Sequence, residues 1–448
     1  MGGQGGLLQL VAQGKQDIFL SGNPQITWFK MVYRRYTNFA IESQPMYFDG
    51  TPDFGKKITC NVPRRGDLLG QVFLEVTLPA LNLLNSDGTK GPALSYVNSV
   101  GHALIQEITI EVGEQEIDRQ NGEWMEIWSR YTTTKDKQTG FYNMIGKVDG
   151  YSPPTLFGPI KLFIPLKFWF CKNPGLALPL IALQYHPIRI NLTLRPLNKL
   201  FFSQALTTPA CSTLQVTPVQ ITELMLWGDY IYLDPEERRR FVSSTHEYLI
   251  EQVQYTAPIA IAPGSTSASL RLEFNHPIRE LFWYIRRDDM VRFNEIFNYS
   301  SLGTFEIGKR TDLLADAVLQ LDGFDRFKVR DAGYFRLVQP WQYHTVIPEE
   351  NFVYSYSFSL RPEDLQPSGS MNASRMDSIV LQLTINNEYS GTTCSSSSTT
   401  ANSYPTSSEN TTDTTLKSTT GTLSSRVFAI NHNVLRIADG FGGVLFTI

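Results

Sequence analysis

Hydrophobic and polar residues alternate with a period of two along much of the chain. The clearest runs cover residues 72–78, 188–194, 270–274, 352–360 and 379–385. Such alternation places one face of a strand on a core and the other toward solvent or a second layer. Pro, Gly, Asn and Asp residues separate these runs in the way that turns do. The pattern predicts an all-β sandwich.

Helical spacing occurs at three places between these runs. Apolar residues recur every three or four positions over 26–36 and again over 124–131, which is typical of amphipathic helices. A third helix is expected to begin with Asp234 as N-cap and Pro235 at its first position, followed by acidic residues that favour the helix dipole. This helix lies near the midpoint of the chain, where a connector between two domains is expected.

Four blocks recur in the same order in the two halves of the sequence. The first block, 58–62 followed by 69–76, matches 270–274 followed by 281–285. The other three match 110–113 with 320–323, 163–188 with 354–379, and 219–232 with 427–437. Each match alone is weak, but the shared order indicates an internal duplication. We therefore predict an N-terminal arm (1–26), a first sandwich (27–233), a helical connector (234–245) and a second sandwich (246–448).

A low-complexity insert interrupts the second half. Between residues 390 and 425, 23 of 36 residues are Ser or Thr, a composition that cannot bury a core. We expect an exposed loop there, and we expect it to point away from any packed partner.

Composition limits the classes of function. The chain has 448 residues and a net charge of −4, and only 18% of its residues are charged, where a soluble globular chain usually carries about 25%. The acidic balance excludes a protein that coats nucleic acid, because backbone neutralisation needs a basic excess. The longest apolar run, 176–183, is too short for a membrane span of ~20 residues. Burial between subunits would deplete charge, and the Ser/Thr insert, which has only three charged residues, accounts for part of the deficit.

No residue constellation typical of catalysis or of metal binding is found. The sequence has no phosphate-binding glycine loop, no HExxH motif and no GxSxG motif. Six histidines are scattered singly, and the four cysteines (Cys60, Cys171, Cys211 and Cys394) are far apart. This spacing favours reduced, buried thiols over a disulfide framework or a metal site. We predict no catalytic, cofactor-binding or metal-binding residues and no cofactor.

A small basic face lies near the N-terminus. Lys30, Arg34 and Arg35 share the helix expected over 26–36, and residues 1–41 carry a net charge of +3. The pattern is consistent with a surface helix whose basic side chains reach solvent. It agrees equally well with a contact to phosphates, lipid headgroups or an acidic partner.

Four asparagines head N-x-S/T sequons, the acceptor sequence for N-glycosylation. Asn191 lies inside a strand pattern and is a poor acceptor, whereas Asn298, Asn372 and Asn410 lie in loop-like sequence. The start of the chain shows no secretory signal, so the usual glycosylation machinery would not reach these three candidates.

Several segments resemble a known family. They are 21–30 (SGNPQITWFK), 33–42 (YRRYTNFAIE), 173–186 (NPGLALPLIALQYH), 246–252 (HEYLIEQ), 274–277 (FNHP), 354–358 (YSYSF), 366–369 (QPSG) and 433–437 (NVLRI). In combination they resemble the major capsid proteins of nucleocytoplasmic large DNA viruses, especially the chlorella-virus (phycodnavirus) type. The resemblance implies a double jelly roll, which is two tandem eight-stranded jelly rolls with a few short helices and long surface loops.

The resemblance also implies a structural role and no enzymatic one. Members of this family form homotrimers, whose six similar lobes make a pseudo-hexagonal capsomer that tiles an icosahedral shell. The implied partners are neighbouring capsomers, minor capsid and penton proteins, and an inner viral membrane reached through the N-terminal segment, with no direct genome binding. The implied location is the outer capsid shell of the virion, assembled in the host cytoplasm. Lys30, Arg34 and Arg35 would then face the particle interior, and the Ser/Thr-rich loop the exterior.

Two other classes of protein use a similar architecture. A carbohydrate-binding or glycan-hydrolysing jelly-roll protein agrees with the 12% aromatic content, but no convergent carboxylate or metal pattern supports it. A cupin-like metal enzyme is disfavoured by the scattered histidines. Glycan binding by an isolated subunit, or hydrolysis of a polysaccharide, would favour the first alternative, and a stable trimer would favour the capsid hypothesis.

Overall fold

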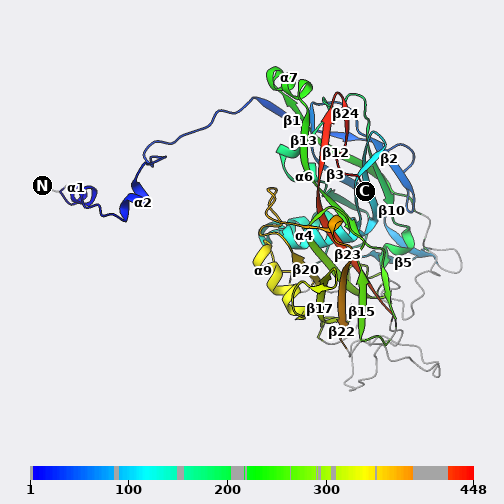
Figure 1. Ribbon diagram of the computed structural model, residues 1–448. Helices are drawn as coiled ribbons and strands as arrows, with labels where there is room; N and C mark the ends of the chain where they lie inside the picture. Colours follow the sequence, from blue (N-terminus) through cyan, green and yellow to red (C-terminus); the bar gives the residue numbers. More distant parts are fainter. Residues whose placement is uncertain are drawn as a thin grey trace. The chain divides into compact units, whose positions relative to one another are not determined.

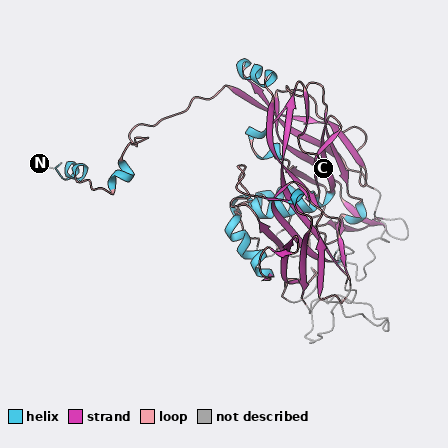
Figure 2. Cartoon of the chain, in the orientation of Figure 1, coloured by secondary structure: helices cyan, strands magenta, loops and turns pink. Residues whose placement is uncertain are grey.

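The computed structural model describes residues 4–84, 90–148, 156–202, 216, 219–262, 264–288, 290, 294–303, 309–348, 351–386 and 422–447. The chain divides into two compact units, residues 1–39 and residues 40–448. Strands make up most of the regular secondary structure of the larger unit, and its helices are short (Figure 1, Figure 2). The prediction of an all-β fold is confirmed.

The N-terminal unit contains two short helices, α1 (Gln4–Val11) and α2 (Asp17–Ser21). The helix predicted over 26–36 is wrong, because these residues form a turn followed by extended chain with exposed side chains. Helices in proteins gain most of their stability by packing an apolar face against a core. The described residues of this unit provide no core, and the aromatic and β-branched residues of the segment have only modest helix propensity.

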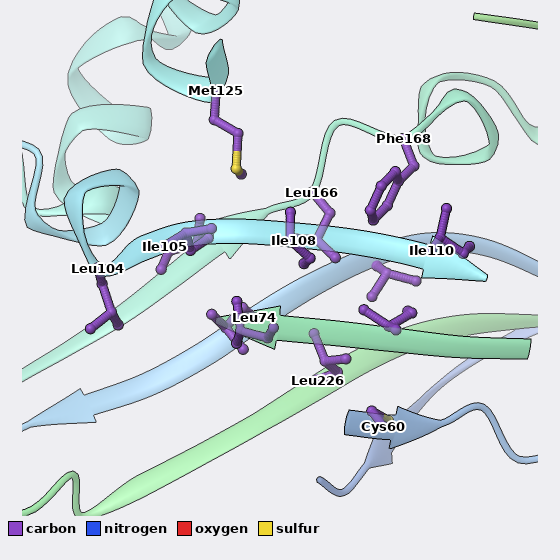
Figure 3. Packing of buried hydrophobic residues seen from close by; sticks show 14 of the residues in the cluster. Cys60, Leu74, Leu104, Ile105, Ile108, Ile110, Met125, Leu166, Phe168 and Leu226 are labelled. Atoms are coloured by element: carbon purple, nitrogen blue, oxygen red, sulfur yellow. The ribbon is translucent and has the colours of Figure 1, made fainter. Parts of the chain in front are cut away.

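The first half of the larger unit contains a five-stranded sheet with the strand order β1-β12-β3-β8, in which β9 (Leu178–Pro179) also pairs with β3, and a four-stranded sheet with the order β2-β10-β6-β7. Their bounds are β1 (Phe39–Met46), β12 (Glu223–Leu233), β3 (Leu68–Leu78), β8 (Ile160–Pro165), β2 (Lys57–Asn61), β10 (Ile188–Leu194), β6 (Ile105–Val112) and β7 (Gln115–Gln120). The apolar positions of the two sheets share one buried core. Figure 3 shows Leu74, Ile108 and Leu226 in the layer between these strands.

The second half repeats this arrangement, with strand orders β13-β23-β16-β20 and β15-β22-β17-β18. Their bounds are β13 (His246–Tyr255), β23 (Leu423–Ala438), β16 (Pro277–Arg287), β20 (Val353–Ser357), β15 (Ser267–Arg271), β22 (Ile379–Ile385), β17 (Leu314–Leu321) and β18 (Phe324–Asp325). Strand by strand, the order in each sheet corresponds to that of the first half. The predicted internal duplication is confirmed.

Matching hairpins strengthen the correspondence. β6 and β7 are joined through Gly113 and Glu114, and β17 and β18 through Asp322 and Gly323. All four linking residues have positive φ angles, which is the geometry of the type I′ turn that suits the twist of a two-residue hairpin.

The remaining elements are short and lie between these strands. They are β4 (Leu81–Leu84), β5 (Lys90–Tyr96), β9 (Leu178–Pro179), β11 (Phe201–Phe202), β14 (Ile259–Ile261), β19 (Arg330–Asp331), β21 (Met371–Asn372), β24 (Phe441–Val444), α3 (Val100–Leu104), α4 (Gly122–Thr132), α5 (Lys135–Ile145), α6 (Trp169–Lys172), α7 (Pro235–Ser243), η3 (Tyr334–Val338), α9 (Gln339–Tyr343), η1 (Pro174–Leu176), η2 (Leu197–Lys199) and η4 (Ala373–Arg375). α4 and α7 confirm the other two predicted helices. The Asp234 carboxylate accepts a hydrogen bond from the Glu236 amide at 3.4 Å, as expected of an N-cap.

The 16-residue strand β23 is shared by both halves. Val427 and Ala429 pack in the second core, whereas Leu435 and Ile437 pack in the first. β13 pairs with β23 over ten residues, so one ribbon of two strands joins the sandwiches. The start of β23 also corrects the predicted loop over 390–425. Residues 423–425, the last of the predicted loop, already belong to β23. The part from 390 to 421 lies outside the described residues.

Both described cysteines, Cys60 and Cys171, are buried and free. Burial raises the pKa of each thiol to about 12. A thiol in this state carries no thiolate at neutral pH and is chemically inert. The prediction of buried, reduced thiols is confirmed for these two residues.

Candidate assembly surfaces

The two halves meet at an aromatic junction built on α4. Trp124, Ile127, Trp128 and Tyr131 follow helical spacing, so they share one face of the helix, and all four are buried. They pack against the outer face of the β16-β23 pair and against β20, through Phe282, Tyr284, Phe428, Ile430 and Val353. The Asn121 side chain caps the helix by accepting a hydrogen bond from the Trp124 amide at 2.8 Å. In Figure 1, α4 lies beside β23 and β20.

The rings of this junction adopt favourable aromatic geometries. The centroid of Trp124 lies 5.6 Å from that of Phe282 and 5.8 Å from that of Phe428, in edge-to-face and stacked arrangements. Tyr131 meets Phe282 edge to face at 5.1 Å. Such pairs contribute about 0.5–1.5 kcal/mol each beyond the burial of their area. The junction therefore holds the two halves in one fixed relation.

A β-bulge brings two charged residues of β16 to this junction. The pairing register of β16 with β23 shifts between Ile278 and Glu280. Ile278 packs in the second core, as do Leu281 and Trp283. Because of the extra residue in the bulge, Arg279 and Glu280 both lie on the face of the strand away from the core. A bulge re-aims side chains in this way.

One buried carboxylate, Glu123, is held by two arginines of the second half. Its oxygens lie 3.0 Å from Arg286 Nη1 and 2.7 Å from Arg426 Nη1, and the Tyr284 hydroxyl donates a hydrogen bond to it at 2.8 Å. Burial alone would raise the pKa of Glu123, but the two guanidinium groups outweigh it and lower the pKa to about 2. Glu123 is therefore charged at neutral pH.

Glu251 is held in the same way, because Lys172 from the first half and Arg279 from the second both contact its carboxylate. Burial opposes ionisation of Glu251, but the two cations lower its pKa to about 2. Each partner comes from a different half, so this cluster also joins the two sandwiches.

His344, directly after α9, is a buried cation between two carboxylates. Its Nε2 lies 2.6 Å from Glu280 and its Nδ1 lies 2.9 Å from Glu363, and its ring meets Tyr131 of α4 edge to face at 4.9 Å. Burial would lower the pKa of His344, but the two carboxylates outweigh it and raise the pKa to about 9. Buried ion pairs add little net stability, yet removal of one partner costs about 3–5 kcal/mol. The clusters therefore act mainly by fixing how the two halves are oriented.

The predicted basic residues lie in the N-terminal unit. Lys30, Arg34 and Arg35 are exposed on extended chain, and Trp28 and Phe29 beside them are 87% and 98% exposed. The predicted helical face does not exist, but basic and aromatic side chains still lie close together along one short segment, 28–36.

The candidate glycosylation sites differ in accessibility. Asn372 is exposed, whereas Asn298 is buried and its amide donates hydrogen bonds to Glu295 at 2.7 Å and to the Leu302 carbonyl at 3.0 Å. A glycan needs a free, accessible amide, so Asn372 is the candidate we retain. Asn410 lies outside the described residues.

The described residues hold no group of three or more His, Cys, Asp or Glu side chains that could bind a metal ion. Among the described helices, none is both long and apolar enough to cross a membrane.

The alternation of hydrophobic and polar residues does not predict the buried charges of the junction, although the sequence contains a signal for them. Glu280 and Arg286 stand in the run 277–287, whose other residues are mostly apolar. Charged residues are almost never fully buried unless they are paired, so a charge within such a strand indicates a partner on another element. The sequence does not reveal that the partner of Arg286 is Glu123, 163 positions away.

Comparison with known proteins identifies the family. A family model described as "Major capsid protein N-terminus" matches residues 27–234, and one described as "Large eukaryotic DNA virus major capsid protein" matches residues 237–443. The major capsid protein of Pyramimonas orientalis virus is 37% identical, over 99% of both chains. This chain belongs to the major capsid protein family of large eukaryotic DNA viruses.

Other relatives of this capsid protein agree. The major capsid protein of Paramecium bursaria Chlorella virus 1 is 35% identical, again over 99% of both chains. A chain from the quasi-atomic model of the PBCV-1 virus capsid superposes with a TM-score of 0.72 at 31% identity, covering 94% of this chain and all of that one. The Faustovirus major capsid protein has a TM-score of 0.71 at 14% identity, over 95% and 94% of the two chains, which shows a shared fold. The fold is a double jelly roll.

Proposed function

We propose that the protein is a structural subunit that forms homotrimers, and that these capsomers tile the icosahedral shell of a large DNA virus. The observation that carries the proposal is the repeated strand order of the two halves, locked together by the buried junction at α4. Three copies of a duplicated lobe make six similar lobes, which is the shape of a pseudo-hexagonal tile. The role needs no catalytic residue and no cofactor.

The proposal assigns the N-terminal unit to partners on the inner side of the shell. Large side chains are exposed throughout this unit, among them Phe19, Trp28, Phe29 and Tyr36. Soluble proteins rarely leave so many apolar groups uncovered, and such groups mark interaction sites. Together with Lys30, Arg34 and Arg35, they suit minor capsid and penton proteins or an inner viral membrane with anionic headgroups.

The remaining parts of the proposal concern the other surfaces. Neighbouring capsomers meet side by side, the exposed Asn372 is the candidate glycan acceptor, and the shell assembles in the host cytoplasm. The net charge of −4 supports the absence of direct genome binding, because a chain that coats DNA needs a basic excess.

Solution mass tests the proposal. Light scattering of the purified chain is expected to give about 152 kDa, three times the subunit mass of 50.7 kDa, and the trimer is expected to survive dilution because obligate interfaces bury roughly 2,000–5,000 Å². Contacts between trimers should weaken as salt is added, since smaller polar contacts are screened. A stable 50.7 kDa monomer would refute the trimer, and a salt-insensitive shell built from dissociating trimers would reverse the proposed order of strengths.

A further inference from the structure

The outer face of the first-half sheet carries an aromatic cluster that no described element covers. Phe73 of β3 pairs across the strands with Trp227 of β12, and their rings stack at 6.4 Å. Phe163 of β8 meets Phe73 edge to face at 6.4 Å. These three residues, which we call the first-half sheet face, are only half-buried and belong to none of the buried clusters. The buried Trp227 Nε1 has no hydrogen-bond partner among the described residues.

The corresponding positions of the second half are covered. Phe282 of β16 pairs with Phe428 of β23 just as Phe73 pairs with Trp227. Two residues further along these strands, Tyr284 of β16 pairs with Val353 of β20, and Glu75 of β3 pairs with Phe163 of β8. Val353 therefore occupies the position that corresponds to Phe163. Phe282, Phe428 and Val353 are all buried under α4. The same sheet face is therefore covered in one half and open in the other.

A helical segment of the second half carries the matching apolar face. α4 lies between β7 and β8, and the segment made of η3 and α9 lies between the corresponding strands, after β18 and before β20. Tyr334, Leu337, Val338 and Trp341 have the same 3, 4 and 7 spacing as the buried residues of α4. We call these four residues the helical stripe.

Three of the four residues of the helical stripe point away from their own core, whereas Tyr334, at its start, packs partly against that core. Leu337, Val338 and Trp341 are 37%, 39% and 71% exposed, whereas Phe335 and Pro340 on the other side of the segment are buried. Amphipathic helices of globular proteins bury their apolar face. The segment also contains a π-helical turn, η3. Such turns are rare in proteins, and those that occur are often found at functional sites. The stripe therefore lacks the cover that its spacing predicts.

We propose that the helical stripe of one copy docks on the first-half sheet face of a second copy, and so repeats between chains the contact that α4 makes within the chain. The inference rests on the proposed homotrimer and names its contact surface. The occupant is a second copy because the only structural template for this contact in the described chain is an equivalent helix on an equivalent sheet. Such a contact is head-to-tail, and a head-to-tail contact forms a closed ring when the rotation between copies permits it. Three copies then present six helix-on-sheet contacts, three within chains and three between them.

A matched pair of variants tests the contact. Trp341→Ser removes the most exposed residue of the stripe, and Phe324→Ser removes an aromatic residue that is 79% exposed on β18, outside the stripe. Both substitutions are at exposed positions, so both chains should keep the fold and its far-UV circular dichroism. Central tryptophans of interfaces contribute about 2 kcal/mol or more, which corresponds to a rise of about 30-fold in the dissociation constant. We expect Trp341→Ser to shift the species from about 152 kDa toward 50.7 kDa, while Phe324→Ser leaves it unchanged.

Crosslinking gives a second readout that does not depend on stability. A chain with Leu337→Cys is coexpressed with a chain with Phe163→Cys, and each chain alone is the control. A disulfide-linked pair of about 101 kDa, twice 50.7 kDa, is expected only in the mixture.

The outcomes separate the two hypotheses. A wild-type trimer that is unaffected by Trp341→Ser and forms no crosslink overturns the docking surface but leaves the proposed function intact. A wild-type monomer overturns the proposed homotrimer and, with it, the contact between copies.

Discussion

In the second half, α4 covers Phe282 and Phe428 on the outer face of the β16-β23 pair, and all of these residues are buried. In the first half, the equivalent pair, Phe73 and Trp227, lies half-exposed on the same face of the equivalent sheet. Both faces have the aromatic character of an interface. Within one chain, a helix covers only one of them. The difference therefore separates a contact made during folding from the one that we propose forms between copies.

The largest expected effect comes from a matched tryptophan pair. Trp124→Ala removes a fully packed ring from the junction and should lower the free energy of unfolding by about 3–5 kcal/mol. Trp227→Ala removes a ring from the first-half sheet face, and in the isolated subunit it should cost less, about 2 kcal/mol, because part of this ring is already exposed. Urea unfolding of the dissociated subunit measures both. Equal losses would show that the two faces do not differ as described.

Removal of Glu123 tests the charges of the junction. Glu123→Ala leaves the buried Arg286 and the half-buried Arg426 without their carboxylate, and we expect a loss of about 3–5 kcal/mol. The control is Glu116→Ala, which breaks an exposed pair with Arg119 and should cost at most about 1 kcal/mol. Chemical denaturation of the two variants gives the comparison, and a loss below 1 kcal/mol for Glu123→Ala would contradict the role assigned to the cluster.

The buried His344 makes the junction sensitive to alkaline pH. The pKa of His344 is about 9 in the folded protein, against 6.5 for an ordinary histidine, as in the unfolded chain. Below pH 6.5, the proton that His344 binds between Glu280 and Glu363 therefore contributes its full stabilisation to the fold. That contribution is lost as pH rises through 9 and is on the order of 3 kcal/mol. The free energy of unfolding, measured by denaturant at pH 6.5 to 10, should fall more steeply for wild type than for His344→Gln. Parallel curves would exclude this contribution.

The two equivalent hairpins should respond differently to the same substitution. A Cβ on Gly113 would lie 2.3 Å from the His186 ring, whereas a Cβ on Gly323 would meet no atom within 4 Å. Both glycines have positive φ, a conformation that costs an L-residue roughly 1–2 kcal/mol. Gly113→Ala should therefore lose about 2–3 kcal/mol and Gly323→Ala about 1 kcal/mol, because the first adds a steric clash. Thermal unfolding of both variants distinguishes them, and a reversed order would contradict the packing of His186.

The smallest effect on stability is expected in the N-terminal unit. Substitution of Lys30, Arg34 and Arg35 by Ala removes only exposed charges, so the free energy of unfolding should change by less than about 0.5 kcal/mol. Binding of the chain to vesicles that contain anionic lipid should weaken at least tenfold, since each basic residue contributes about 1 kcal/mol at such a surface. Alanine at the exposed Lys135 and Lys137 is the control. Unchanged vesicle binding in the triple variant would remove the membrane from the proposed partners.

Much of the fold could be predicted from the sequence. The period of two identified strands such as 188–194 and 379–385, the shared order of blocks identified the duplication, and Asp234-Pro235 located the connecting helix. The helix over 26–36 could not be predicted correctly, because a local pattern does not reveal whether a core is present to receive it. The limits of the Ser/Thr-rich segment were also misplaced, because composition does not show where Ser424 and Ser425 join a strand.

The sequence by itself determined which faces of strands and helices are apolar, because alternation and helical spacing involve only residues a few positions apart along the chain. It also determined that the two halves are duplicates of one fold. Only the tertiary structure decided which apolar face is covered, because α4 and Phe428 are joined by contacts between positions about 300 residues apart. The tertiary structure also explains part of the low charge content of the chain. The junction buries its few charges as ion pairs. The first-half sheet face and the helical stripe consist of uncharged side chains, and the ion pair of Lys161 with Glu75 lies beside Phe163.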